Sequence, residues 1–294
     1  MNKNVKRKVL CVCCSLISCT LFFVLQWGVY HYLLSNKKQF VSPVAEENTI
    51  IRLQNASQLR GDVLFMGSSL TERLLPQDNL TTLATPGSSF TASLALLKDP
   101  NQFKPGTVYV LEVNNMFSGE DPQILEKTRD WSFNYCRDSS HFSLAAKPTS
   151  LIVSLLYSFS SKDKGRKYEP FDDIVAVPED TSTAPSLTED EIQKWAALLQ
   201  GIEQIKSRGG QICLVYMPLK VMSAHYKSSY QKGCKLANYL KLPLLNYQET
   251  DVFKYLIYTD SAHLKTNHEA TRRFMRTIAR DAVRHAVVPP DVAP

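Results

Sequence analysis

Two short blocks, far apart in the chain, contain the residue types of nucleophilic catalysis. Ser69 follows the apolar run 62–66 and Gly67, and Asp260 precedes His263 by three residues near the C-terminal end. A serine hydroxyl is a weak nucleophile until a base removes its proton, and histidine is the side chain that most often does so near neutral pH. A carboxylate three residues away on a loop can orient one ring nitrogen while the other faces the serine. Either block alone is equally typical of a turn with a helix cap.

The elements that must position these blocks alternate in type. Short apolar runs predict buried strands, and the amphipathic stretches between them predict helices. The clearest helix, 188–207, begins with a capping box of Thr188 and Glu191 and ends before Gly209-Gly210. This order predicts an α/β domain of three layers, whose mostly parallel sheet is covered on both faces and carries the site beyond the carboxyl ends of its strands. The expected strands are 62–66, 80–84, 107–113, 212–217 and 242–245, and the other expected helices begin at 69 or cover 90–97, 226–240 and 266–285.

Four blocks, taken together and in order, resemble the SGNH/GDSL hydrolase superfamily over most of residues 60–285. They are Phe-Met-Gly67-Ser68-Ser69-Leu-Thr, Ala-Thr-Pro-Gly87-Ser, Leu-Glu-Val-Asn114-Asn115 and Asp260-Ser-Ala-His263-Leu. The resemblance implies a flavodoxin-like SGNH-hydrolase fold that works without a cofactor or a metal. It also implies that Ser69, His263 and Asp260 are the catalytic residues. The Gly87 N–H and the Asn114 side-chain amide would form the oxyanion hole with the amide of Ser69.

The chain departs from the pattern of this superfamily at three positions beside these residues. Ser68 and Asn115 stand where the family more often has Asp, and Glu112 stands where it has Gly. These departures concern the loop geometry and the local charge of the substrate pocket, because every expected catalytic residue is present. The adjacent serines also leave the register of the first block open between Ser68 and Ser69.

The resemblance further implies a substrate class and a location. Anchored members of the superfamily resemble proteins that place or remove acetyl and other acyl groups on cell-envelope polysaccharides, often beside a multi-span membrane O-acyltransferase. We therefore expect a serine esterase or an O-acyltransferase that acts on an acylated glycan through an acyl-serine. The alternative from another class is a non-catalytic SGNH-shaped scaffold or glycan-binding protein of an envelope complex.

The charge of the chain lies at its N-terminal end. The formal net charge is +6, and residues 1–39 carry six basic and no acidic residues, so the body is neutral. A nucleic-acid-binding protein needs its excess positive charge on the folded surface, so this distribution argues against a nucleic-acid partner. The uncharged apolar segment 9–34 is long enough to cross a membrane, and more basic residues precede it than follow it. This bias predicts a cytoplasmic N-terminus and a body outside the cytoplasmic membrane.

The length of segment 9–34 favours an uncleaved anchor, although two alternatives share parts of the pattern. One is a cleaved signal peptide, and the other is a lipoprotein in which Cys19 follows Leu16-Ile17-Ser18 and carries a lipid. The organisation expected along the chain is a basic cytoplasmic tail (1–8), the transmembrane anchor (9–34), a stalk (35–57), the hydrolase-like domain (58–285) with an insertion at about 118–187, and a flexible tail (286–294).

The remaining cysteines and histidines form no metal-binding pattern. Cys136, Cys213 and Cys234 are too few for a disulfide framework and lack zinc-ligand spacing. Cys213 lies in an apolar run and is predicted to be a buried small hydrophobic residue. A bridge between Cys136 and Cys234 stays open. Surface or structural roles are expected for His141, His225 and His268.

Overall fold

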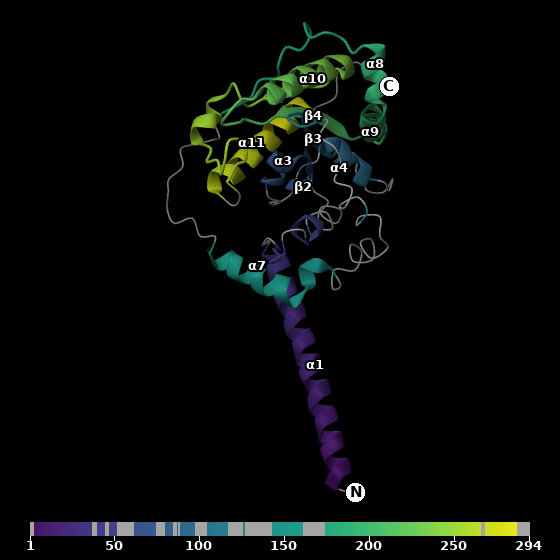
Figure 1. Cartoon of the computed structure of the whole chain (residues 1–294), viewed down its shortest axis with the longest axis vertical. Helices are drawn as coiled ribbons and strands as arrows, with labels where there is room; N and C mark the ends of the chain where they lie inside the picture. The colour runs from purple at the N-terminus through teal and green to yellow at the C-terminus, as the bar shows by residue number, and fades with distance from the viewer. Residues whose placement is uncertain are drawn as a thin grey trace.

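The computed structural model describes residues 3–36, 40–44, 47–51, 62–74, 80–84, 87, 89–97, 105–116, 126, 143–160, 174–265 and 268–286. A long N-terminal helix, α1 (Lys3–Ser35), extends away from an α/β body (Figure 1). Residues Leu10–Ser35 of α1 are long and apolar enough to cross a membrane. The apolar side chains along this stretch are exposed up to Leu25, as they would be toward lipid.

Five parallel strands form the sheet of the body, in the order β2-β1-β3-β4-β5. This is the strand order of flavodoxin-like folds, so the predicted α/β class is confirmed. The two central strands are almost entirely buried, which explains why the sequence shows unbroken apolar runs rather than alternation. The strands are β1 (Val63–Gly67), β2 (Leu80–Ala84), β3 (Val108–Glu112), β4 (Gln211–Tyr216) and β5 (Leu244–Asn246).

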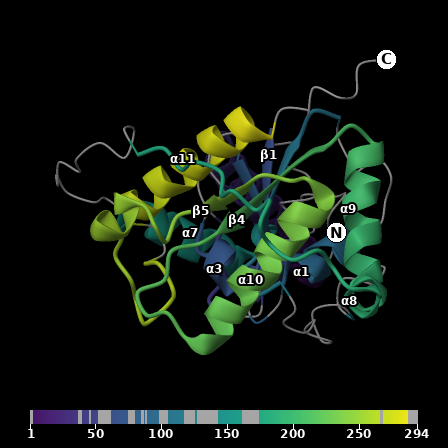
Figure 2. The same cartoon turned by 90° about the horizontal axis from the view of Figure 1, so that it is seen from above.

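Helices cover both faces of this sheet. The C-terminal helix α11 (Glu269–His285) lies on one face, and α9 (Ala196–Ser207) and α10 (Ala224–Leu240) lie on the other (Figure 2). The helix α4 (Phe90–Leu96) packs against α9 and the strands β1 and β2. The four-residue helix α3 (Ser69–Glu72) follows β1 directly. The predicted three-layer arrangement is therefore present.

The helix predicted over 188–207 is interrupted in the structure. Its capping box forms, with Thr188 and Glu191 bonding each other reciprocally, but the helix divides into α8 (Glu189–Lys194) and α9 at Trp195. Trp195 leaves helical geometry with φ −99° and ψ 9°, and its side chain is buried in the core. The interruption lets the polar first segment stay on the surface while the indole enters the core.

The segment predicted to be a stalk is packed where the structure describes it. Phe40 and Ile51 are buried against Tyr30 and Leu33 of α1, together with residues of a short 3-10 turn, η3 (Leu144–Ala146), and of α7 (Pro148–Ser160). These contacts tie the end of α1 to part of the region predicted to be an insertion. Residues 287–294 of the predicted tail and most of the region 118–142 lie outside the described residues.

Candidate active site

Ser69, His263 and Asp260 come together at the carboxyl edge of the sheet. Ser69 Oγ lies 2.8 Å from His263 Nε2, and His263 Nδ1 lies 2.8 Å from Asp260 Oδ2. The side chains of His263 and Asp260 are 27% and 51% exposed, so the group is open to solvent. A serine hydroxyl, an imidazole and a carboxylate in this sequence are the geometry of a nucleophile, a general base and its orienting group.

Asp260 is fixed by the backbone of its own loop. Its Oδ1 accepts hydrogen bonds from the N–H groups of His263 (2.7 Å) and Ala262 (2.8 Å), while Oδ2 faces the imidazole. These bonds stabilise the ionised form, the His263 N–H most strongly, and lower the pKa of Asp260 to about 2. Asp260 is therefore an anion throughout the physiological range, as an orienting carboxylate must be.

The loop that carries Asp260 and His263 is closed by short-range contacts. Thr259 N–H donates to His263 O at 2.8 Å, and Tyr258 and Leu264 form an antiparallel bridge. The Tyr258 hydroxyl also donates to the carbonyl of Pro218, in the loop that follows β4 (3.1 Å). The loop is thus held against the sheet edge where β1 and β3 end.

The two adjacent serines have different roles, which settles the register that the sequence left open. Ser68 is buried, accepts from the Leu70 N–H at 3.2 Å as the N-cap of α3, and donates to Glu112. Ser69 is partly exposed and meets His263 instead. The position where the family more often has Asp is therefore a structural cap in this chain.

Glu112 is a buried carboxylate under the turn that presents Ser69. It accepts from the N–H and the hydroxyl of Ser68 (2.8 and 2.8 Å) and from the hydroxyl of Thr71 (2.7 Å), with a longer bond from the Thr71 N–H (3.3 Å). Burial raises the pKa of Glu112, and these hydrogen bonds oppose the rise. The residue that replaces the family's Gly therefore ties β3 to the first turn of α3.

Gly67 makes room for this carboxylate. A Cβ at position 67 would lie 2.5 Å from Glu112 Oε2 and 2.6 Å from both Glu112 Cβ and Thr71 Oγ1. Such distances are well inside van der Waals contact, so a side chain at position 67 and a glutamate at position 112 exclude each other. The glycine of the first block is thus needed for space.

Of the two residues expected in the oxyanion hole, Asn114 has its side chain bonded elsewhere, whereas Gly87 lies at the same sheet edge as Ser69. Asn114 is fully buried, and its amide donates to Met217 O (2.9 Å) and accepts from Met217 N–H (2.7 Å), which joins the ends of β3 and β4. Its side chain is therefore committed to β4 and is not exposed to solvent. Gly87 follows β2 at the same sheet edge with φ +69°, and a Cβ there would meet nothing, so the backbone conformation rather than space favours glycine.

Asn115 is the neighbouring amide that the sequence analysis did not select. Its Nδ2 donates to Ser68 Oγ at 3.2 Å, and its Oδ1 lies 3.0 Å from His225 Nε2 on α10. Tyr226 also contacts Asn115, and burial raises the pKa of this tyrosine. Asn115 is partly exposed beside the turn of Ser69, so its amide is better placed than that of Asn114 to reach a bound ester. The pair Asn114-Asn115 could have indicated this role, but the sequence did not show which of the two asparagines is partly exposed beside Ser69.

The described histidines and cysteines fit the structural roles predicted for them. His268 caps α11 by accepting from Ala270 N–H at 3.2 Å, Cys213 is fully buried, and Cys234 carries a free thiol. Among the described residues no group of three or more His, Cys, Asp or Glu is arranged to hold a metal ion. Cys136 and His141 lie outside the described residues.

Comparison with protein-family models and with curated proteins found no match for this chain. The resemblance to SGNH/GDSL hydrolases therefore stays a prediction from the four sequence blocks.

Proposed function

We propose that this protein is a membrane-anchored serine esterase or O-acyltransferase that works through an acyl-Ser69 intermediate. The observation that carries the proposal is the unbroken contact of Ser69 Oγ with His263 Nε2 and of His263 Nδ1 with Asp260, at 2.8 Å each. Ser69 comes from the N-terminal part of the 294-residue chain, and Asp260 and His263 come from its C-terminal part. The three side chains meet in the order that serine activation requires.

The reaction follows from this order. Ser69 Oγ attacks the ester carbonyl while His263 Nε2 takes the hydroxyl proton, and Asp260 stabilises the imidazolium that forms. As the C–O bond to the alcohol breaks, His263 returns the proton to the leaving oxygen, and the acyl group stays on Ser69. A water or a second hydroxyl then gives its proton to His263 and attacks the acyl-serine. The bond between the acyl carbon and Ser69 Oγ breaks, His263 returns the proton to Ser69 Oγ, and the acid or the new ester leaves the restored enzyme. Water gives hydrolysis, and a sugar hydroxyl gives transfer.

The proposal places the site outside the cytoplasmic membrane. The apolar part of α1 (Leu10–Ser35) is the anchor, and Lys3, Lys6, Arg7 and Lys8 before it favour a cytoplasmic N-terminus. The resemblance to envelope acyl-transfer proteins extends the proposal to acyl esters of an envelope glycan, with acetyl as the first group to test. The same resemblance adds a multi-span membrane O-acyltransferase as a proposed partner.

The test is covalent labelling of the full-length protein in mild detergent with a fluorophosphonate, read by intact mass. We expect one label on the wild type and none on Ser69→Ala or His263→Ala. Ser261→Ala is the matched serine control, because Ser261 is an exposed residue of the same loop, and His285→Ala, in the last turn of α11, is the matched histidine control. Both controls should keep the label. A folded wild-type protein that takes no label would refute the proposed mechanism in favour of the scaffold.

A second measurement separates the two reaction types. After brief incubation with an aryl acetate and an acid quench, an added acetyl group on the peptide containing Ser69 marks the intermediate. If an oligosaccharide shortens the lifetime of this intermediate and becomes acetylated, the protein is a transferase. If the intermediate decays at the same rate with and without the sugar, it is a hydrolase toward that substrate.

A further inference from the structure

The helix α7 has a stripe of exposed apolar side chains. Ile152, Leu156 and Phe159 are 60%, 64% and 61% exposed, and their spacing of four and three residues places them on one side of the helix. None of the 13 residues of α7 is charged. A soluble surface helix normally turns polar residues outward, so this stripe needs a partner.

The opposite side of α7 is packed inside the protein. Leu151 is buried beside Tyr30 and Leu33 of α1, and Ser154 Oγ accepts from the Val41 N–H at 2.8 Å. Just before α7, the Ala146 carbonyl accepts from Gln26 Nε2 of α1 at 2.7 Å. The helix α7 is thus attached to the last third of α1 and lies across it (Figure 1).

The length of α1 indicates the depth in the membrane at which α7 lies. The 26 residues Leu10–Ser35 make a helix of about 39 Å at about 1.5 Å per residue, whereas a hydrocarbon core is about 30 Å thick. If the core begins near Leu10, it ends near Val29, after about 20 residues. Tyr30 and Leu33, which contact α7, then lie at the headgroup level.

The basic residues near α7 in the sequence agree with a position at the headgroup level of the membrane. Lys147, which precedes the helix, is paired with Glu47 at 2.6 Å, and the run Lys162-Asp-Lys-Gly-Arg-Lys167, with four basic residues and one acidic, follows α7 closely in the sequence. Lys37 and Lys38 follow α1. Basic residues beside an apolar helix face are typical of segments that lie in a membrane surface containing anionic lipid.

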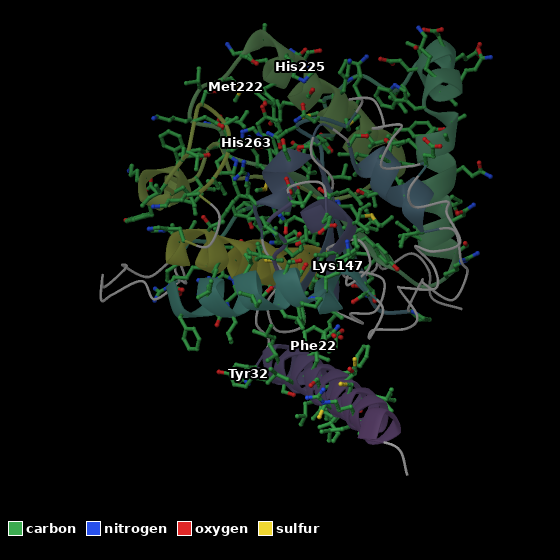
Figure 3. The ribbon with its side chains drawn as sticks, turned by 60° about the horizontal axis from the view of Figure 1, so that its bottom comes forward. Phe22, Tyr32, Lys147, Met222, His225 and His263 are labelled. Atoms are coloured by element: carbon green, nitrogen blue, oxygen red, sulfur yellow. The ribbon has the colours of Figure 1, made fainter. Side chains whose placement is uncertain are left out.

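We infer that α7 lies in the outer interface of the membrane, with Ile152, Leu156 and Phe159 inserted among the lipid chains. The inference rests on α1 spanning the membrane, and it is independent of the chemistry at Ser69. The exposed stripe would give the body a second attachment to the bilayer beside α1. Two attachments fix its orientation, whereas one helix would let it rotate. His263, His225 and Met222 lie farther from α1 than Lys147 does in Figure 3, so this orientation holds the catalytic group above the lipid.

The experiment is site-specific photo-crosslinking in the full-length chain, reconstituted into nanodiscs of phosphatidylethanolamine and phosphatidylglycerol. A benzophenone amino acid replaces Phe159, and the adducts are identified by mass spectrometry. Phe22 of α1, 49% exposed, is the matched positive control. Tyr239 of α10, 42% exposed on the part of the body remote from α1, is the matched negative control (Figure 1). We expect lipid adducts at position 159 approaching those at 22 and severalfold above those at 239.

A second variant tests the apolar face itself. Leu156→Glu places a charge among the lipid chains and should lower the lipid adducts at position 159 severalfold. Val177→Glu, at a position 76% exposed elsewhere on the body, should leave them unchanged. Both side chains are exposed, so neither change disturbs the core.

The outcomes are distinct. Lipid adducts at position 159 that Leu156→Glu suppresses would support the inference. Background adducts at 159 with strong adducts at 22 would overturn it, and so would crosslinks from 159 to another membrane protein in native membranes without lipid adducts. If position 22 gives no lipid adducts, the premise that α1 spans the membrane fails and the inference falls with it, whereas fluorophosphonate labelling of Ser69 would be unaffected.

Discussion

Replacing Gly67 by alanine should damage both the fold and the reactivity of Ser69. The new Cβ would lie 2.5 Å from Glu112 Oε2 and 2.6 Å from both Glu112 Cβ and Thr71 Oγ1. Ordinary contacts of this kind are about 3.5 Å, so the neighbours must move by about 1 Å. Neither neighbour can move freely, because Glu112 is the last residue of β3, Thr71 lies in α3, and both are buried.

The expected loss has two parts. Overpacking of a close-packed site costs about 1–3 kcal/mol. Displacing Glu112 from the N–H and hydroxyl groups of Ser68 and Thr71 adds about 1–3 kcal/mol, because buried donors lose their acceptor. A total near 3 kcal/mol lowers the melting temperature of a body of this size by roughly 6–12 °C. A shift of about 1 Å at the neighbouring Ser69 should also slow its reaction about a hundredfold.

The assay measures thermal unfolding by near-ultraviolet circular dichroism and the rate of fluorophosphonate labelling, both on the full-length protein in detergent. The matched second changes are Glu112→Ala and Glu112→Gly. Glu112→Ala keeps the Cβ that lies 2.6 Å from the new methyl group and should not relieve Gly67→Ala, whereas Glu112→Gly removes that atom. In the Glu112→Gly background, Gly67→Ala should therefore cost less than it does alone, by a coupling of about 0.5–3 kcal/mol. Wild-type melting and labelling in the Gly67→Ala single variant would refute the argument.

Three further predictions concern residues around the catalytic group. Asn115→Ala should lower the acylation rate about a hundredfold with little change in melting temperature, if its amide reaches the oxyanion; equal rates would exclude that role. Asn114→Ala should instead lower the free energy of unfolding by about 1–3 kcal/mol, because the N–H and carbonyl of Met217 lose their partner, as urea titration would show. The folded-state pKa of Asp260, about 2, lies below the ordinary value near 3.9, so its ionised form stabilises the fold above pH 3.9 and this contribution disappears as the pH falls toward 2. The difference in melting temperature between wild type and Asp260→Ala should therefore narrow over that interval, and a constant difference would contradict the pKa shift.

The strands are the part of the fold that the sequence predicts well, and the structure also brings together the three residues proposed as the catalytic group. Parallel strands buried on both faces require unbroken apolar runs, so 62–66 and 212–217 could be recognised locally and differ from β1 and β4 by only a residue or two. Ser69 could be selected because it follows such a strand, and His263 could be selected because it precedes the final helix. Their 2.8 Å contact then follows from the sheet order, which brings the ends of the first and last strands to one edge.

Other features depend on contacts that have no local signature. In the sequence, Glu112 is only a departure from the pattern of the superfamily. Its role is visible only in the structure, where residues 68–71, more than 40 positions earlier, donate hydrogen bonds to it. Asn114 and Asn115 are identical in type and adjacent, so only the position of Met217 decides which one is buried. Phe40 is one of a few scattered apolar residues in a polar stretch without a period, and its partner Tyr30 belongs to a helix that the sequence assigns to lipid.

The loop 258–264 contains both the proposed base and its carboxylate, and the hydrogen bonds between His263 and Asp260 join positions three apart. Two longer-range bonds, from the Tyr258 hydroxyl to Pro218 O and from Val221 N–H to Ser261 O, attach the loop to the segment after β4. The His263–Asp260 pair itself can form locally, since closing a short loop costs little entropy. The Ser69–His263 bond, by contrast, joins positions 194 residues apart. In the proposed enzyme this contact is a single long-range joint, so a partly folded or strained chain would hold a paired imidazole with no hydroxyl to activate. Protection from premature reaction during synthesis and export would then arise from topology alone, without an inhibitory segment.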